Sequence, residues 1–254
     1  MTSTSHTAPV VILLHGAGLN GASWNPVRRH IDPRIELFTP DLPGHGARLG
    51  ERFTLQGAVD VVLAAVSTAG GRQVVVGGDS LGGYVSTACA AALPPEQLKG
   101  LILSGCSANF AGAAAMLPVM LKKLGSQLTT LLLNQRQIDH LLLGKLRGFG
   151  LGESDIAAIM AGGMNPGIFP HAVDALRGVD FRAKVAAVTE PILFVNGAKD
   201  AFCMRQQAAF IAAARAPQHH TMDNTDHGVS LLRSADFAAL VNRFALPRFG
   251  LAAA

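Results

Sequence analysis

The sequence is poor in charged, aromatic and cysteine residues, and these shortages exclude several classes of protein. Charged side chains make up 15% of its 254 residues and hydrophobic ones 49%, a balance that excludes a disordered chain and predicts a well-packed core. This length suits one domain, or one domain with an insertion. Outside glycine-rich strand and turn segments no uncharged run approaches the roughly 18 residues of a membrane span, so no membrane-spanning helix is expected.

Cysteine is both rare and badly placed for cross-linking. The three cysteines, Cys89, Cys106 and Cys203, are odd in number and far apart, and they lack the spacing of a zinc site. We therefore expect buried free thiols and a cytoplasmic protein. The opening residues, MTSTSHTAP, contain no charged segment followed by an apolar one, and so they predict no secretory signal.

The sequence also has only a small excess of basic charge. The formal net charge is +4, and its densest points are the pairs Arg28-Arg29 and Lys122-Lys123. We interpret these as solvated surface. No nucleic-acid partner and no membrane partner is expected, and the oligomeric state stays open.

The sequence does contain short apolar runs that alternate with longer segments rich in alanine and leucine. Near-continuous apolar runs, with no polar alternation, are typical of parallel strands covered on both faces. The order of strand and helix predicts a doubly wound α/β fold. The expected strands cover residues 10–15, 35–39, 73–77, 98–104, 192–196 and, more weakly, 219–222, with helices at 55–69, 83–92 and 205–214 among them.

The rhythm stops between residues 106 and 188, where only helical patterns occur. That length far exceeds an ordinary connection between strands. We therefore expect a core of residues 1–105 and 189–254 and a helical cap of residues 106–188 over one end of the sheet. The expected cap helices cover residues 113–124, 128–143, 154–161 and 169–176, with breaks at glycines that include Gly125 and Gly144.

One short motif carries the chemistry. Gly78-Asp79-Ser80-Leu81-Gly82 reads G-x-S-x-G between a predicted strand and a predicted helix, which is the setting of a nucleophile elbow. The turn exposes the serine hydroxyl, and the small residues on either side allow the chain to approach itself closely. Asp79 is an alternative nucleophile, but a frame shifted by one residue would require a small residue where Leu81 stands.

A serine nucleophile needs a base and an acid that orients the base. Asp200 follows the fifth predicted strand, on the same edge of the sheet as Ser80, and His227 follows the sixth, next to a glycine. Asp223 and Asp226 are rival acids. We favour Asp200, because both rivals belong to the loop of the histidine itself.

Together these motifs resemble the α/β-hydrolase superfamily, in particular its capped, serine-nucleophile, esterase-like branch. His15-Gly16-Ala17-Gly18 is similar to the oxyanion loop of that family, and Asp41-Leu42-Pro43-Gly44-His45-Gly46 is similar to its D-x-P-G-H-G turn. The resemblance implies the triad Ser80, His227 and Asp200, an oxyanion hole formed by the backbone N–H groups of Ala17 and Leu81, and no cofactor or metal. Substrate contacts are expected from Gly16, Trp24, Met120 and Met164.

Two departures from the family pattern affect these expectations. Position 79 is Asp where many members carry His, which we expect to change the polarity at that end of the sheet. Only nine residues precede the first predicted strand, which leaves too little room for the two antiparallel strands with which the family usually begins. The expected sheet is therefore shortened, with about six parallel strands.

The expected function is hydrolysis of an ester or related acyl bond in a small to medium, largely apolar substrate. The same triad also serves thioester, lactone and C–C bond hydrolysis, and the residues do not separate these. A ligand receptor without turnover is another interpretation. A remoter one is an NAD(P)-dependent oxidoreductase, because the stretch from Gly16 to Gly21 reads G-x-G-x-x-G after a strand, although Pro26 would fall inside the helix that this fingerprint requires.

Overall fold

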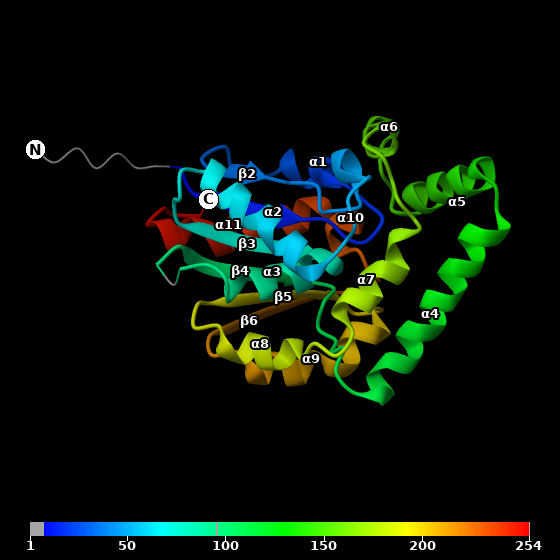
Figure 1. Cartoon of the computed structure of the whole chain (residues 1–254). Coiled ribbons are helices and arrows are strands. Elements are labelled where there is room, and N and C mark those ends of the chain that lie inside the picture. Colours follow the sequence, from blue (N-terminus) through cyan, green and yellow to red (C-terminus); the bar gives the residue numbers. More distant parts are fainter. Residues whose placement is uncertain (1–7, 95, 254) are drawn as a thin grey trace, which may run out of the picture.

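A parallel sheet of six strands forms the centre of the molecule (Figure 1). The computed structural model describes residues 8–94 and 96–253, with only the backbone described for 113–118; most of the segment used to judge a secretory leader lies outside this part. The strand order is β2-β1-β3-β4-β5-β6, which confirms the predicted doubly wound, shortened sheet. The strands are β1 (Val10–Leu14), β2 (Glu36–Phe38), β3 (Val74–Asp79), β4 (Leu98–Ser104), β5 (Ile192–Gly197) and β6 (Pro217–Met222).

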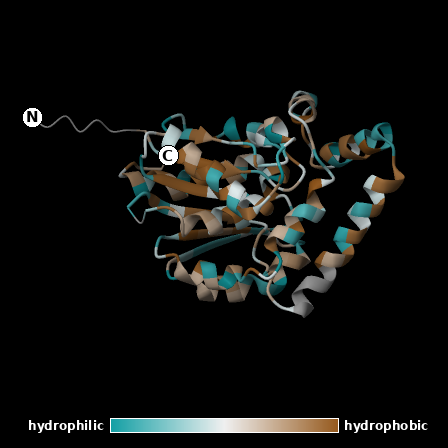
Figure 2. Ribbon diagram, in the orientation of Figure 1, coloured by the Kyte–Doolittle hydropathy of each residue, from teal (hydrophilic) through white to brown (hydrophobic). Residues whose placement is uncertain are grey.

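Both faces of the sheet are covered at its centre, so the inner strands β1, β3, β4 and β5 are buried and largely apolar, whereas the edge strand β6 is polar and mostly exposed. All five residues of β1 are buried, and because side chains alternate along a strand they enter two separate cores. Val10, Ile12 and Leu14 pack with helices α2 (Leu55–Thr68) and α3 (Leu81–Ala90). Val11 and Leu13 pack with α1 (Asn25–Arg28) and α11 (Ser234–Ala245). The inner strands accordingly appear brown in Figure 2, whereas the edge strand β6 is teal.

Five helices lie between β4 and β5: α4 (Ala113–Leu132), α5 (Gln135–Gly148), α6 (Glu153–Ala161), α7 (Ile168–Leu176) and α8 (Phe181–Ala187). The side chain of Asn134 begins α5 with a capping box completed by Gln137. The expected breaks at Gly125 and Gly144 are wrong, because both glycines lie inside helices. A Cβ at either position would meet nothing within 4 Å, so glycine costs the helix about 1 kcal/mol there without ending it.

These helices differ in how firmly they contact the rest of the molecule. Buried residues of α7 and α8, such as Val173 and Phe181, belong to the same apolar cluster as β1. Helix α6 is attached by Asp155, which is buried and accepts two hydrogen bonds, at 2.9 and 2.6 Å, from Arg29. Helices α4 and α5 extend away from the sheet in Figure 1. They carry six exposed leucines: Leu121, Leu124, Leu128, Leu131, Leu132 and Leu141.

Three further loops follow strands β5, β6 and β1 at the carboxyl end of the sheet, and each leads into a helix. Helix α9 (Ala201–Ala213) follows β5, and the short α10 (Val229–Leu232) follows β6. The G-x-G-x-x-G stretch runs into a 3₁₀ turn (Gly21–Trp24) and the four-residue α1, whose second residue is Pro26, and not into a long helix at a phosphate site. Within the described part of the chain, no helix is long and apolar enough to cross a bilayer.

Candidate active site

Ser80 sits in a strained turn at the end of β3. Its φ of +53° lies in the region that side chains other than glycine rarely adopt, and α3 begins at the next residue. The turn is tight: a Cβ on Gly78 would lie 2.5 Å from the carbonyl carbon of Gly82, and a Cβ on Gly82 would overlap the carbonyl oxygen of Leu14. The two glycines of the motif are therefore required by contact, and the turn holds the Ser80 side chain at the cavity described below.

Asp79, the alternative nucleophile, has a different orientation. Its side chain is buried and accepts hydrogen bonds from the hydroxyls of Ser104 and Ser230, both at 2.6 Å. It is not among the residues that line the cavity, whereas Ser80 is. The change of polarity expected at position 79 thus falls below the surface, within the end of the sheet.

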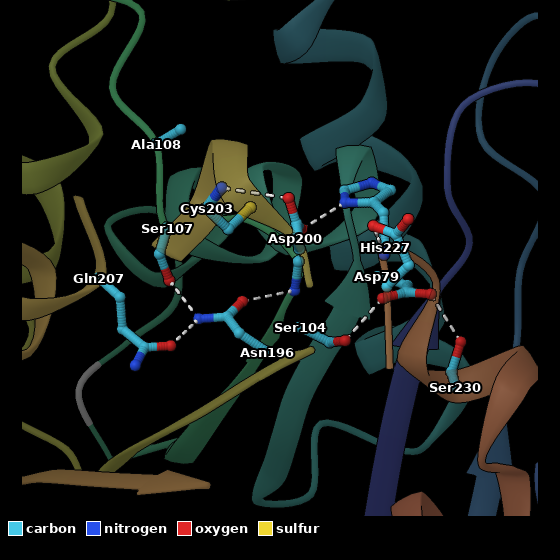
Figure 3. Close-up of polar contacts among 12 residues, drawn as sticks. Asp79, Ser104, Ser107, Ala108, Asn196, Asp200, Cys203, Gln207, His227 and Ser230 are labelled. Carbon is cyan, nitrogen blue, oxygen red and sulfur yellow. Dashed lines mark hydrogen bonds and ion pairs between the residues drawn. The ribbon is translucent and has the colours of Figure 1, made fainter. Parts of the chain in front are cut away.

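His227 and Asp200 are in direct contact. Nδ1 of His227 lies 2.7 Å from Oδ2 of Asp200 (Figure 3). The other carboxylate oxygen accepts a hydrogen bond of 3.2 Å from the backbone N–H of Cys203 and so caps helix α9. Because a carboxylate accepts hydrogen bonds, Nδ1 carries the proton, and Nε2 is left with a free lone pair.

Backbone contacts fix the two loops that carry these residues. The N–H of Lys199 donates to the carbonyl of Thr225 at 2.9 Å. Gly197 lets the chains approach, because a Cβ there would lie 2.6 Å from the carbonyl oxygen of Asp226. The Asp226 side chain accepts the backbone N–H of His227 at 2.7 Å, so it holds the loop. Of the three candidate acids, the structure brings Asp200 to the imidazole ring.

The charges of the pair shift both pKa values in the directions that favour an ion pair. Desolvation lowers the pKa of His227, but the hydrogen bond and charge of Asp200 and the charge of Asp79 raise it, and the net pKa is above the ordinary value. Burial raises the pKa of Asp200, the contact with His227 lowers it, and the net pKa is below the ordinary value. The arrangement therefore stabilises an imidazolium, when one forms, more than an isolated histidine would be stabilised.

The expected oxyanion loop lies next to the serine. A Cβ on Gly16 would be 3.7 Å from Cβ of Ser80, and Ala17 and Leu81 both line the same cavity. His15 anchors this loop: its Nε2 accepts the N–H of Leu42 at 3.1 Å, and its Nδ1 lies 3.0 Å from the carbonyl of Gly16. Burial lowers the pKa of His15 to about 3, so its ring is neutral. The N–H of Leu81 belongs to the first turn of α3, whose N–H groups have no partner within the helix.

A cavity of about 380 Å³ joins these groups. Ser80, His227 and Asp200 line it together with Ala17 and Leu81. Its remaining wall is mainly apolar and comes largely from the helices after β4. The apolar residues of this wall are Phe110, Val119, Phe169, Ala172, Val173, Leu176 and Phe202.

Three of the expected substrate contacts lie elsewhere. The indole of Trp24 is buried against Phe237, with ring centroids 5.7 Å apart, in the core on the face of α11, because the 3₁₀ turn directs it there. Met120 is not among the cavity-lining residues, whereas its neighbour Val119 is, because successive residues of a helix point in different directions. Met164 lines a second cavity, of about 270 Å³, which shares Ala17 and Phe169 with the first.

One group of three potential metal ligands lies within the described residues. Asp200, Cys203 and His227 offer ligand atoms within 4.8 Å of one another. Burial, together with the nearby Asp200, raises the pKa of the Cys203 thiol far above its usual range. A thiol that keeps its proton is a poor ligand, and the Nδ1–H of His227 is already donated to Asp200. These residues therefore suit proton transfer better than metal binding.

Comparison with known families identifies the class of protein. The model of the alpha/beta hydrolase family matches residues 11–240. The chain therefore belongs to the α/β hydrolase family, which confirms the resemblance seen in its motifs. It is similar to the pimeloyl-[acyl-carrier protein] methyl ester esterase of Serratia marcescens, with 30% identity over 80% of each chain. The enzyme of the same name from Pseudoalteromonas atlantica is 25% identical over 93% of this chain and 94% of its own.

Solved structures share the fold over almost the whole chain. MenH from S. aureus superposes with a TM-score of 0.77 at 15% identity, covering 98% of this chain and 97% of that one. A thermophilic esterase from Thermogutta terrifontis superposes with a TM-score of 0.76 at 19% identity, covering 96% and 91%. At these identities the likeness describes the fold alone.

Proposed function

We propose that this chain hydrolyses carboxylic esters with Ser80 as nucleophile, His227 as base and Asp200 as the acid that orients the base. One observation carries the proposal: the 2.7 Å contact between His227 and Asp200 lies on the same cavity as a serine with a positive φ. The curated relatives, which are named as ester hydrolases, support the choice of bond.

The proposed reaction begins when Nε2 of His227 removes the proton of Ser80 as its Oγ attacks the ester carbonyl carbon. Asp200 holds the Nδ1–H tautomer and stabilises the imidazolium that forms. His227 then gives the proton to the leaving alcohol, which departs from an acyl-enzyme. Water, activated by the same imidazole, releases the acid and restores Ser80.

The negative charge of the tetrahedral intermediate is assigned to the backbone N–H groups of Ala17 and Leu81. The location of both residues on the cavity, one on the loop anchored by His15 and one at the start of α3, supports this assignment. The positive end of the α3 dipole adds to the stabilisation of an anion there. Preorganised donors of this kind contribute about 2.7–4 kcal/mol each to the lowering of the barrier.

The walls of the cavity suggest the kind of acyl group. Phe110, Val119, Phe169 and Leu176 present apolar surface, which suits a small to medium apolar chain. Lys122 is an exception, with its Nζ 5.6 Å from the ring centroid of Phe202. A narrower form of the proposal is a methyl ester of an acyl chain attached to a carrier protein, as the names of the relatives indicate for those proteins.

We further propose that residues 106–188 act as a cap that selects the substrate, with residues 1–105 and 189–254 as the catalytic core. Most of the apolar cavity wall comes from this segment, which supports the assignment. The attachment of α6 through Asp155 and of α7 through the core suggests that α4 and α5 are its freer part.

The test is hydrolysis of matched esters, thioesters and lactones by the wild type and by Ser80→Ala. Acyl chains of increasing length are included, with methyl esters both free and attached to a carrier protein. We expect ester turnover in the wild type and a loss of at least about 10⁴-fold in Ser80→Ala. Binding of the same compounds without turnover would favour a receptor, and preferred turnover of thioesters or lactones would change the bond type but keep the triad.

A further inference from the structure

Asp79 is a buried carboxylate for which the proposed reaction has no use. It is 4% exposed, and it immediately precedes Ser80 at the end of β3. Ser104 on β4 donates to one of its oxygens and Ser230 on α10 donates to the other, each at 2.6 Å. Burying a charge costs folding free energy unless hydrogen bonds compensate for it. Here two hydroxyl groups donate to the carboxylate and hold it in place.

This carboxylate faces the catalytic histidine across Gly105. A Cβ on Gly105 would lie 3.1 Å from Cε1 of His227 and 3.6 Å from Oδ1 of Asp79, so both side chains border the same small space. Gly105 has a φ of +57° and leaves that space empty of side-chain atoms of its own. In Figure 3, Asp200 lies beside the imidazole and Asp79 lies beneath it.

We propose that Asp79 is a second acid of this site, a positioning residue whose buried carboxylate stabilises the protonated imidazole of His227 together with Asp200. The inference rests on the proposed role of His227 as base. Asp200 fixes the tautomer through a hydrogen bond, and Asp79 adds negative charge without contacting the substrate cavity. During acylation and deacylation the ring becomes positive, so a fixed charge near Cε1 stabilises both transition states.

The other charged groups around the ring do not supply this effect. Asp226, on the same loop, accepts the backbone N–H of His227, and its charge is not among the main causes that shift the pKa of the ring. Lys122 from α4 acts in the opposite direction, since its positive charge lowers the pKa of His227, and Lys199 lines the cavity as a second cation. Asp79 is thus the carboxylate that reinforces Asp200, and its charge is among the causes that raise the pKa of His227.

The decisive experiment is a titration of His227 in the wild type and in Asp79→Asn. Histidine-labelled protein is followed by NMR, and the His227 signal is assigned from its absence in His227→Gln. We expect His227 in Asp79→Asn to keep its Nδ1–H tautomer and to titrate at lower pH. The acid limb of the kcat/KM profile shifts to lower pH in parallel, and kcat falls by far less than the roughly 10⁴-fold expected for Asp200→Asn.

Two further variants separate the charge of Asp79 from the pair of serine hydroxyls that hold its carboxylate, called the clamp below. Ser104→Ala and Ser230→Ala each remove one hydroxyl and leave the carboxylate in place. We expect lower melting temperatures but no downward shift in the titration of His227. A shift as large as that of Asp79→Asn in both serine variants would mean that the clamp organises the site and that the charge has no separate role.

A second substitution covers the case in which Asp79→Asn does not fold. Asp79→His replaces the carboxylate by an imidazole, which is neutral at high pH. The proposal is overturned if folded Asp79→Asn or Asp79→His titrates His227 as the wild type does, with an unchanged acid limb. The NMR titration needs no turnover, so it tests the role of Asp79 independently of the proposed function. Ester hydrolysis that survives in Ser80→Ala would refute Ser80 as the nucleophile but would leave the titration result unchanged.

Discussion

Gly78 and Gly82 face each other across the turn that carries Ser80, so close that a Cβ on Gly78 would lie 2.5 Å from the carbonyl carbon of Gly82. A Cβ on Gly82 would overlap Leu14. Both contacts are with backbone, which cannot rotate away as a flexible side chain does. The pattern of small residues in the sequence therefore has a steric cause, and it is this contact that permits the strained φ at Ser80.

Gly82→Ala is expected to lower the free energy of unfolding by at least about 1–3 kcal/mol and to abolish ester hydrolysis, because β1 and the turn must separate. Chemical denaturation and turnover of a simple ester measure the two effects. Gly144→Ala is the matched control, because its Cβ would meet no atom within 4 Å inside α5. There the same change should raise the free energy of unfolding by about 0.5–1 kcal/mol. Equal effects in both variants would contradict the steric account.

Asp200→Asn should reduce kcat about 10⁴-fold while the fold is retained, because an amide at this position favours the wrong imidazole tautomer. Steady-state kinetics and circular dichroism test both parts. Asp223→Asn, on the exposed loop of the histidine, serves as the control and should keep near-normal activity. Loss of activity in Asp223→Asn with little change in Asp200→Asn would assign the acid to the histidine loop.

The rate of ester hydrolysis should fall on the acid side with a midpoint above pH 6.5, the ordinary pKa of histidine. The pKa of His227 is raised, so the ring becomes protonated, and lost as a base, at a higher pH than an isolated histidine would be. A kcat/KM profile from pH 4.5 to 9 locates this limb. In Lys122→Gln the acid limb should move to still higher pH, because the charge of Lys122 lowers the pKa of His227. A movement of the limb to lower pH would contradict the assigned charges.

Two adjacent residues of α4 test the substrate contacts. Val119 lines the cavity and Met120 does not. Val119→Ala should enlarge the cavity and shift the preferred acyl chain towards greater length, whereas Met120→Ala should leave the preference unchanged. Relative kcat/KM values over a series of p-nitrophenyl esters give the readout. If both variants change melting temperature and neither changes chain-length preference, the segment completes the core and does not select substrate.

The fold and the triad candidates were predictable because their signals are local. Apolar strands covered on both faces leave continuous runs, and even the exposed edge strand β6 was placed within two residues of its start. The contact between Asp200 and His227 follows from their positions after neighbouring strands of a parallel sheet. The direction of each side chain was harder, since Trp24 and Met120 differ from cavity residues only in orientation.

The helices between β4 and β5 show that a glycine in the sequence does not by itself mark the end of a helix. Gly125 and Gly144 face open space, where a helix tolerates glycine, so the residue type alone predicts a break that does not occur. The inward orientation of Asp79 could not be predicted either, because its partners Ser104 and Ser230 come from distant parts of the chain. Neither serine has a local signal that links it to position 79.

The most direct test of the central claim is the site of covalent labelling. A fluorophosphonate ester reacts with an activated serine hydroxyl and stays attached, so intact mass followed by peptide mapping identifies the nucleophile. The account predicts one label per chain, on Ser80, with labelling lost in Ser80→Ala and in His227→Gln. Labelling should be kept in Ser86→Ala, because Ser86 lies on helix α3 and its hydroxyl donates to the backbone carbonyl of Gly82. A label on another residue, or ester turnover that persists in Ser80→Ala, would contradict it.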